Sequence, residues 1–229
     1  MSLAPPEADG PLLRERLRTA RLYLCCDARP HGEDPEALLR AALGGGVDIV
    51  QLREKELGRA EIERAAGTYR RIADTYSALF IVNDEPELAR ACDADGVHVG
   101  KASEVAAARE LLGPDMIVGL STHSEEEIAA AAELPVDYIA VGPIWETPTK
   151  PRRPGVGLGL IEHAAAHAPH PFFAIGGISP FNAEEVVRAG AGRLCVVRAV
   201  RDAPNPGVAA EALRRAFAVV DGRGIAPGG

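Results

Sequence analysis

The sequence predicts a single-domain (β/α)8 barrel, an α/β fold in which parallel strands alternate with helices. Short apolar runs alternate with helical patterns along the chain, and eight such units can be counted. Eight units in about 200 residues fit a closed barrel, which commonly has this size. A flavodoxin-like or Rossmann sheet is the alternative, although an open sheet usually has fewer strands or a longer chain.

The predicted strands are apolar on successive residues, as parallel strands covered on both faces are. They are residues 22–26, 49–52, 79–83, 96–99, 117–120, 138–141, 172–175 and 194–197. Helix signals lie between them. Ser124 and Glu127 form a capping-box pattern before a helix over 128–134, and Ser179 with Pro180 begins a later helix.

The predicted barrel covers residues 21–221, with an N-terminal extension over 1–20 and a tail over 222–229, both outside the site. The chain has 25 Lys and Arg residues against 33 Asp and Glu residues, which gives a net charge of −8. This balance argues against a nucleic-acid-binding face, because such binding depends on the neutralisation of many phosphates. An anionic ligand must therefore be held by a local group of basic residues.

The chain also lacks the signals of membrane and secreted proteins. No apolar run approaches the roughly 20 residues that cross a bilayer, and the N-terminus shows no signal-peptide pattern. The four cysteines are Cys25, Cys26, Cys92 and Cys195, and their spacing with histidine does not suggest a zinc site. We expect a cytoplasmic protein with buried thiols. A homodimer is the oligomeric form to expect, because it is the commonest one among soluble oligomers.

Functional side chains of such a barrel lie at the carboxyl ends of its strands. After the second strand the chain reads Gln51-Leu52-Arg53-Glu54-Lys55. If the strand stays extended, Gln51, Arg53 and Lys55 point to the same face, and two cations and an amide would meet one ligand. A solvated strand end is the alternative for the same residues.

The third and fourth strands offer polar groups of a different kind. Asn83-Asp84 ends the third strand, and a carboxylate there could bind Mg²⁺ together with substrate phosphate, or could cap the next helix. We interpret His98 as a hydrogen-bonded core or rim histidine rather than a catalyst. Ser103 is expected to be the N-cap of the helix that runs through Leu112.

The later strands add hydroxyl, basic and glycine residues. Ser121 has no nucleophile elbow around it and suits hydrogen-bond donation to an anion. A long proline-rich loop has the features of a lid, with a solvated basic turn as the alternative. The seventh and eighth strand ends are where barrels commonly bind phosphate. The candidates in the loop and at these ends are Thr147, Thr149, Lys150, Gly176, Gly177, Val197 and Arg198.

Six motifs, taken together, closely resemble thiamine-phosphate synthase over about residues 21 to 202. They are Gln51-Leu52-Arg53-Glu54-Lys55, Val82-Asn83-Asp84, Asp95-Gly96-Val97-His98, Gly119-Leu120-Ser121-Thr122-His123, Val141-Gly142-Pro143 with Thr147-Pro148-Thr149-Lys150, and Ile175-Gly176-Gly177-Ile178. The resemblance implies a transferase that joins hydroxymethylpyrimidine diphosphate to a thiazole phosphate. Pyrophosphate is released and thiamine phosphate is formed, with Mg²⁺ as cofactor.

The resemblance also implies roles for individual residues. The pyrimidine diphosphate would be bound by Gln51, Leu52, Arg53, Glu54, Lys55, Asn83, Ser121 and Lys150. Among these, Arg53, Lys55, Ser121 and Lys150 would serve catalysis. Asp84 would hold the metal, and Ser103 stands at the position of a second metal ligand. The thiazole phosphate would be bound by Thr147, Thr149, Gly176, Gly177, Val197 and Arg198.

Two positions depart from the family pattern. The family usually has an aspartate where this chain has Ser103, and many relatives have a serine where it has Arg198. These departures keep two other functions open. A thiazole tautomerase of the same fold would use His123 as a general acid or base, and a catalytically silent barrel would bind a phosphorylated ligand without turnover.

Overall fold

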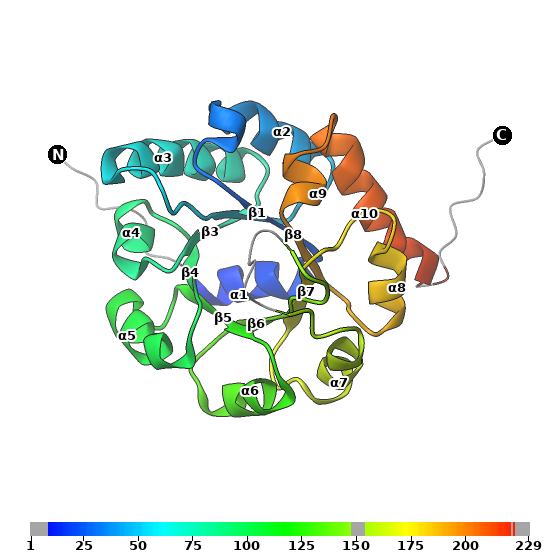
Figure 1. Cartoon of the computed structure of the whole chain (residues 1–229). Coiled ribbons are helices and arrows are strands. Elements are labelled where there is room, and N and C mark those ends of the chain that lie inside the picture. Colours follow the sequence, from blue (N-terminus) through cyan, green and yellow to red (C-terminus); the bar gives the residue numbers. More distant parts are fainter. Residues whose placement is uncertain (1–8, 148–153, 221, 223–229) are drawn as a thin grey trace.

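The computed structural model describes residues 9–147, 154–220 and 222. Parallel strands β1 to β8 follow one another around a closed barrel in chain order, with the helices outside them (Figure 1). The strands are β1 Leu22–Cys26, β2 Ile49–Leu52, β3 Leu79–Asn83, β4 Gly96–Val99, β5 Ile117–Thr122, β6 Tyr138–Val141, β7 Phe172–Ile175 and β8 Leu194–Val196. The predicted barrel is confirmed, since β1 pairs with both β2 and β8.

The helices surround the barrel, apart from the first one. They are α1 Gly10–Thr19, α2 Glu36–Gly44, α3 Arg59–Thr75, α4 Pro86–Ala91, α5 Ala102–Leu112, α6 Glu125–Ala130, α7 Gly159–His167, α8 Ala183–Arg188, α9 Arg198–Arg201 and α10 Pro206–Val220, with short 3-10 turns at Pro30–Gly32 and Ala131–Glu133. None of these helices is long and apolar enough to cross a bilayer, within the part of the chain that the structure describes.

Some helix ends differ from the sequence prediction. Ser124 caps α6 as expected, accepting a hydrogen bond from the Glu127 N–H, but α6 begins at Glu125 and gives way to a 3-10 turn after Ala130. The helix expected from Ser179 begins only at Ala183. The Asn182 side chain accepts the Ser179 N–H at 2.7 Å, so the polar turn before α8 occupies residues that the pattern assigned to the helix.

Apolar side chains form two layers of core. The larger layer lies between the strands and the surrounding helices, whereas a smaller one fills the barrel interior. Inside the barrel the rings of Tyr23, Tyr138 and Phe173 pack edge to face, with centroids 5.3 to 6.1 Å apart. Helix α1 lies across the ring of strands in Figure 1, and its Leu13 and Leu17 join this inner core. Helix α1 therefore covers one end of the barrel interior.

Candidate active site

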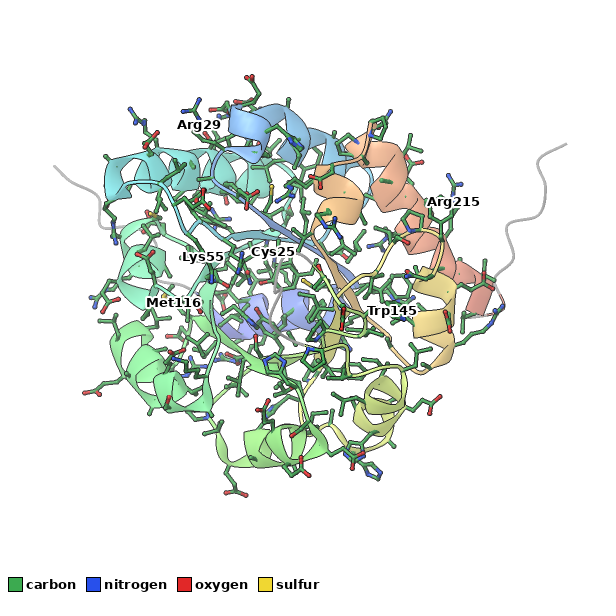
Figure 2. All side chains as sticks on the ribbon, viewed as in Figure 1. Cys25, Arg29, Lys55, Met116, Trp145 and Arg215 are labelled. Carbon is green, nitrogen blue, oxygen red and sulfur yellow. The ribbon has the colours of Figure 1, made fainter. Side chains whose placement is uncertain are left out.

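A cavity of about 390 Å³ opens among the carboxyl ends of the strands. It is lined by side chains from both halves of the barrel, from β1 to β8. The predicted residues among them are Gln51, Arg53, Asn83, Ser121, Thr147, Gly176, Gly177, Val197 and Arg198. Closure of the barrel thus brings together groups that are far apart in the sequence. Figure 2 shows Cys25, which also lines this cavity, inside the ring of strands.

The end of β2 does not follow the predicted alternation. The strand stops at Leu52, and the chain turns through a bend at Lys55. Gln51 and Arg53 line the main cavity, but Lys55 lines a neighbouring cavity of about 550 Å³ that Arg53 also borders. The Leu52 side chain is buried in the core between strands and helices. The expectation that Lys55 shares a face with Gln51 assumed a strand longer than the one that forms.

Glu54 has a structural task. Its carboxylate accepts hydrogen bonds from the backbone N–H groups of Ala28, Lys55 and Glu56 at 3.2, 2.7 and 2.9 Å. Burial acts to raise the pKa of Glu54, but these backbone hydrogen bonds outweigh burial and hold the pKa below its usual range. Glu54 thereby ties the loop after β1 to the loop after β2. Its role in binding substrate stays a prediction.

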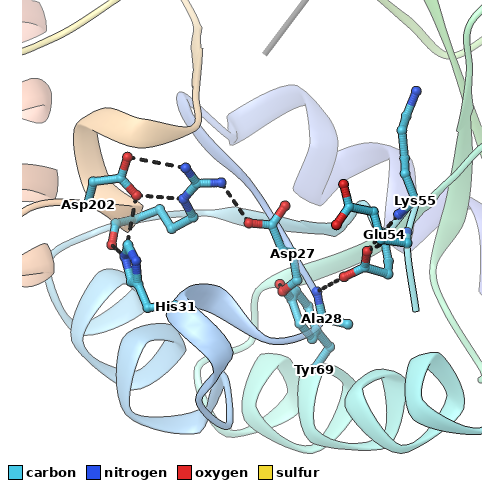
Figure 3. Close-up of polar contacts among 9 residues, drawn as sticks. Asp27, Ala28, His31, Glu54, Lys55, Tyr69 and Asp202 are labelled. Carbon is cyan, nitrogen blue, oxygen red and sulfur yellow. Dashed lines mark hydrogen bonds and ion pairs between the residues drawn. The ribbon is translucent and has the colours of Figure 1, made fainter. Parts of the chain in front are cut away.

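A second set of contacts holds the loop after β1 from the opposite side. Arg201 of α9 pairs with Asp27 at 2.6 Å and with Asp202 at 2.6 Å. His31 of this loop lies 3.4 Å from Asp202. Figure 3 shows Asp27 and Ala28 between Asp202 on one side and Glu54 on the other. The loops after β1, β2 and β8 are thus joined beside the cavity, an arrangement that the sequence pattern did not indicate.

Asp84 is exposed directly after β3 and is not among the residues that line the main cavity. It adopts a left-handed backbone conformation with φ of 61°, and its Oδ2 accepts a hydrogen bond from the Asn83 amide at 2.7 Å. The N-cap of α4 is Glu85, so the alternative in which Asp84 caps this helix is wrong. A side-chain carbon added to Gly100 would lie 3.6 Å from Asp84 Oδ1, which places the carboxylate beside the segment that leads into α5.

Ser103 does not cap α5. The N-cap is Lys101, and the Glu104 carboxylate accepts the Lys101 N–H at 3.1 Å, so the expected cap at Ser103 is wrong. Ser103 is exposed on the first turn. Among the described residues, no cluster of three or more His, Cys, Asp or Glu side chains could hold a metal ion. Mg²⁺ can bind through one or two carboxylates with water and substrate phosphate, so Asp84 fits only a site that the substrate completes.

The floor of the cavity carries a chain of polar side chains. The Gln51 amide donates to the Tyr23 hydroxyl at 2.6 Å, and the hydroxyls of Tyr23 and Tyr138 are 3.0 Å apart. His98 has Nδ1 3.1 Å from the Tyr138 hydroxyl and Nε2 3.0 Å from the Ser121 hydroxyl. The interpretation of His98 as a hydrogen-bonded histidine agrees with these contacts. The sequence pattern does not single out either tyrosine, because each stands within an apolar run typical of a buried strand.

The far side of the cavity is formed by backbone after β7 and β8. Gly176 and Gly177 have φ of 105° and 72°, a conformation that favours glycine. A Cβ at Gly176 would lie 2.4 Å from the Cα of Pro143, so the close approach of the loop after β6 also requires glycine. Val197 and Arg198, which follow the neighbouring strand β8, also line the cavity. Arg198 and Arg53 both border a third cavity of about 250 Å³. The glycine turn, Val197 and Arg198 thus form one wall.

The loop after β6 contributes Thr147 to the cavity, whereas Thr149 and Lys150 lie outside the described residues. His123 lines the cavity as well. Its Nδ1 lies against the Gly142 carbonyl oxygen, which can only accept, so Nδ1 carries the proton of the neutral ring. The backbone N–H of His123 donates to the Glu127 carboxylate at 2.7 Å, a contact that does not involve the ring. The proton on Nδ1 leaves Nε2 as the basic nitrogen of the neutral ring.

Comparison with known proteins agrees with this geometry. The family model described as thiamine monophosphate synthase matches residues 22–200. The chain belongs to this family. The predicted resemblance and the predicted transferase activity are thereby confirmed.

Individual relatives cover nearly the whole chain. The chain is 47% identical to the thiamine-phosphate synthase of Acidothermus cellulolyticus, over 86% of this chain and 95% of the relative. It is 46% identical to that of Saccharopolyspora erythraea, over 91% and 98%. Among solved structures, thiamine phosphate pyrophosphorylase from Pyrococcus furiosus superposes with a TM-score of 0.79 at 33% identity, covering 91% of this chain and 98% of that one.

Proposed function

We propose that the chain transfers the pyrimidinylmethyl group of hydroxymethylpyrimidine diphosphate to the nitrogen of a thiazole phosphate, forming thiamine phosphate and pyrophosphate. The observation that carries this proposal is the arrangement of the main cavity. Gln51 and Ser121 lie on its floor, Arg53 and Asn83 border one side, and the turn at Gly176 forms the other. In this proposal the diphosphate of the pyrimidine substrate lies on the side of Arg53, and the phosphate of the thiazole substrate lies on the side of Gly176. The two aromatic rings meet over the shared floor.

The difficult step is departure of the diphosphate. In the proposed mechanism the bond between the methylene carbon and the diphosphate oxygen breaks, and the thiazole nitrogen then donates its electron pair to that carbon. Positive groups near the diphosphate lower the barrier because its negative charge grows as the bond breaks. One unit-charge pair at 4 Å is worth about 4 kcal/mol at an effective dielectric constant near 20. Arg53, Lys55 and Lys150 are the proposed cations, and no protein nucleophile is required.

The proposed cofactor is Mg²⁺, with Asp84 as its protein carboxylate. When bound, the ion would neutralise charge on the diphosphate oxygens. Ser103 offers a neutral hydroxyl where relatives have a carboxylate, so the substrate must supply more of the coordination. A cytoplasmic location and a homodimer remain predictions from the sequence.

The proposal is tested by mixing both candidate substrates with Mg²⁺ and measuring pyrophosphate and thiamine phosphate. We expect both products in equal amounts, and neither when one substrate is omitted. Pyrophosphate without thiamine phosphate, or no turnover with both substrates bound, would contradict the proposal. The second result would favour a silent phosphate-binding barrel.

One observation supports a second candidate, a thiazole tautomerase. The contact of His123 Nδ1 with the Gly142 carbonyl fixes a neutral ring with basic Nε2, in a residue that lines the cavity. A general base of this kind can move protons on a thiazole phosphate. Conversion of the thiazole substrate alone, without the pyrimidine, would identify this activity. Arg53 and the Asn83-Asp84 pair, which such a reaction does not need, favour the transferase.

A further inference from the structure

The polar chain across the cavity floor joins two predicted substrate-binding residues that lie on different strands. Gln51 belongs to β2 and Ser121 to β5, and the path between them passes through Tyr23, Tyr138 and His98. These three linking side chains are at most 7% exposed. A polar network buried to this extent is costly unless each donor and acceptor is satisfied.

Proton counting gives this chain a direction. An amide nitrogen can only donate, so the hydroxyl of Tyr23 accepts from Gln51. The hydroxyl of Tyr23 then donates its hydrogen bond to the oxygen of Tyr138, its other partner. The hydroxyl of Tyr138 in turn donates a hydrogen bond to His98 Nδ1, which must therefore carry no proton. Nε2 therefore carries the proton of a neutral His98 and donates it to the Ser121 oxygen.

The orientation of Gln51 at the start of the chain has support of its own. The amide oxygen accepts a hydrogen bond from the Cys25 thiol at 3.1 Å, which leaves the nitrogen for Tyr23. Burial raises the pKa of both tyrosines well above the usual range, so each hydroxyl stays protonated and can donate one hydrogen bond. A protonated His98 would meet the Tyr138 oxygen with a second donor, and the direction of the chain would be lost.

We propose that Tyr23, Tyr138 and His98 are positioning residues that fix Ser121 as a hydrogen-bond donor to the substrate. Because the Ser121 oxygen accepts a hydrogen bond from His98, the hydroxyl proton of Ser121 is directed to the cavity. The substrate atom that this hydroxyl contacts must be an acceptor, such as an aromatic ring nitrogen. The chain also holds Gln51 and Ser121 at a fixed separation on the floor. This inference rests on the proposed function for the identity of the substrate, but not for the direction of the chain.

The first test is the tautomer of His98 in the ligand-free protein, measured by ¹⁵N NMR of the histidine rings. We expect an unprotonated Nδ1 and a protonated Nε2. In Tyr138→Phe the donor to Nδ1 is gone, and we expect the preference for this tautomer to weaken. Tyr69→Phe is the matched control. The hydroxyl of Tyr69 is also buried, but it donates to the Asp27 carbonyl at 3.0 Å and takes no part in the hydrogen-bond chain of the cavity floor. The His98 signals should not change in that variant.

The second test is kinetic. We expect Tyr138→Phe to lower kcat/KM for the pyrimidine diphosphate at least tenfold, and Tyr23→Phe to have a smaller effect because Tyr138 can still donate to His98. The KM for the pyrimidine diphosphate should rise while the KM for the thiazole phosphate stays within twofold. A loss of folded protein would instead lower the apparent kcat and leave both KM values unchanged. Melting temperatures identify any variant that fails to fold, and the wild-type tautomer then decides the question.

Two results would overturn the proposal. One is a wild-type His98 protonated on Nδ1, and the other is a Tyr138→Phe variant that matches Tyr69→Phe in both ring signals and kinetics. Failure of the proposed function gives a different result, since the wild type would then form no thiamine phosphate while the His98 tautomer could still be measured.

Discussion

Replacing Gly119 by alanine should displace Tyr138 and destabilise the protein. Gly119 lies on β5 next to β6, and an added Cβ would be 2.1 Å from Tyr138 Cζ and 2.5 Å from its hydroxyl oxygen. Carbon atoms pack at about 3.5 to 4.0 Å, so the ring must move by more than about 1 Å. That movement breaks the Tyr138 contacts to Tyr23 and His98, which are 3.0 and 3.1 Å long.

The expected cost is large for a single methyl group. Overpacking costs about 1–3 kcal/mol, and each buried polar group left without its partner costs about 1–3 kcal/mol. We therefore expect Gly119→Ala to lower the free energy of unfolding by about 3–5 kcal/mol in urea denaturation, assuming that the barrel relaxes only partly. Activity should fall in the fraction that remains folded, because the chain to Ser121 is interrupted.

Gly67 is the matched control for this substitution. It is exposed within α3, and nothing lies within 4 Å of the position that its Cβ would take. Gly67→Ala should therefore stabilise the protein by about 0.5–1 kcal/mol through helix propensity. A Gly119→Ala variant that loses less than about 1 kcal/mol would refute the reasoning, because overpacking alone should cost at least that much.

Three further predictions concern charge. Arg53→Met should lower kcat about 100-fold, or about 2.7 kcal/mol, with little change in melting temperature; normal turnover would remove Arg53 from the leaving-group site. Ser103→Asp should lower the Mg²⁺ concentration needed for half-maximal activity, and an unchanged titration would show that this position is remote from the metal. A hydrogen bond from Arg201 lowers the pKa of Asp202, so this contribution to stability is present above about pH 4 and is lost as the pH falls through the lowered pKa. The stability difference between wild type and Arg201→Met should therefore shrink below about pH 4, and a constant difference would contradict the assignment.

The strands could be predicted closely because each is an apolar run bounded by polar residues. The predicted strands differ from the observed ones only at β5, which continues to Thr122, and β8, which ends at Val196. Helix starts were less predictable. Ser103 is an N-cap candidate by residue type, yet the N-cap lies two residues earlier, at Lys101, whose N–H donates to the Glu104 carboxylate. Local hydrogen bonds of this kind compete with the preference of a single residue.

The site was predictable where it depends on strand ends and less so where it depends on closure of the barrel. Gln51 and Ser121 follow from their positions at strand ends. Tyr23 and Tyr138 do not, because only closure brings inward-facing residues of β1 and β6 within 3.0 Å of each other. Lys55 shows the opposite problem. Its predicted direction required the strand to stay extended through residues 53–55, but β2 ends at Leu52.

An acidic protein can bind anions if its basic residues differ in what they already contact. Arg201 is held between Asp27 and Asp202, and its charge is used within the fold. The Arg53 side chain borders three cavities and takes part in none of the ion pairs found among the described residues. A cation that has no carboxylate partner gains most from an arriving diphosphate, since no existing contact must first be broken. The net charge of −8 therefore says little about the mouth of the barrel. The pairing of each arginine there decides where an anion binds.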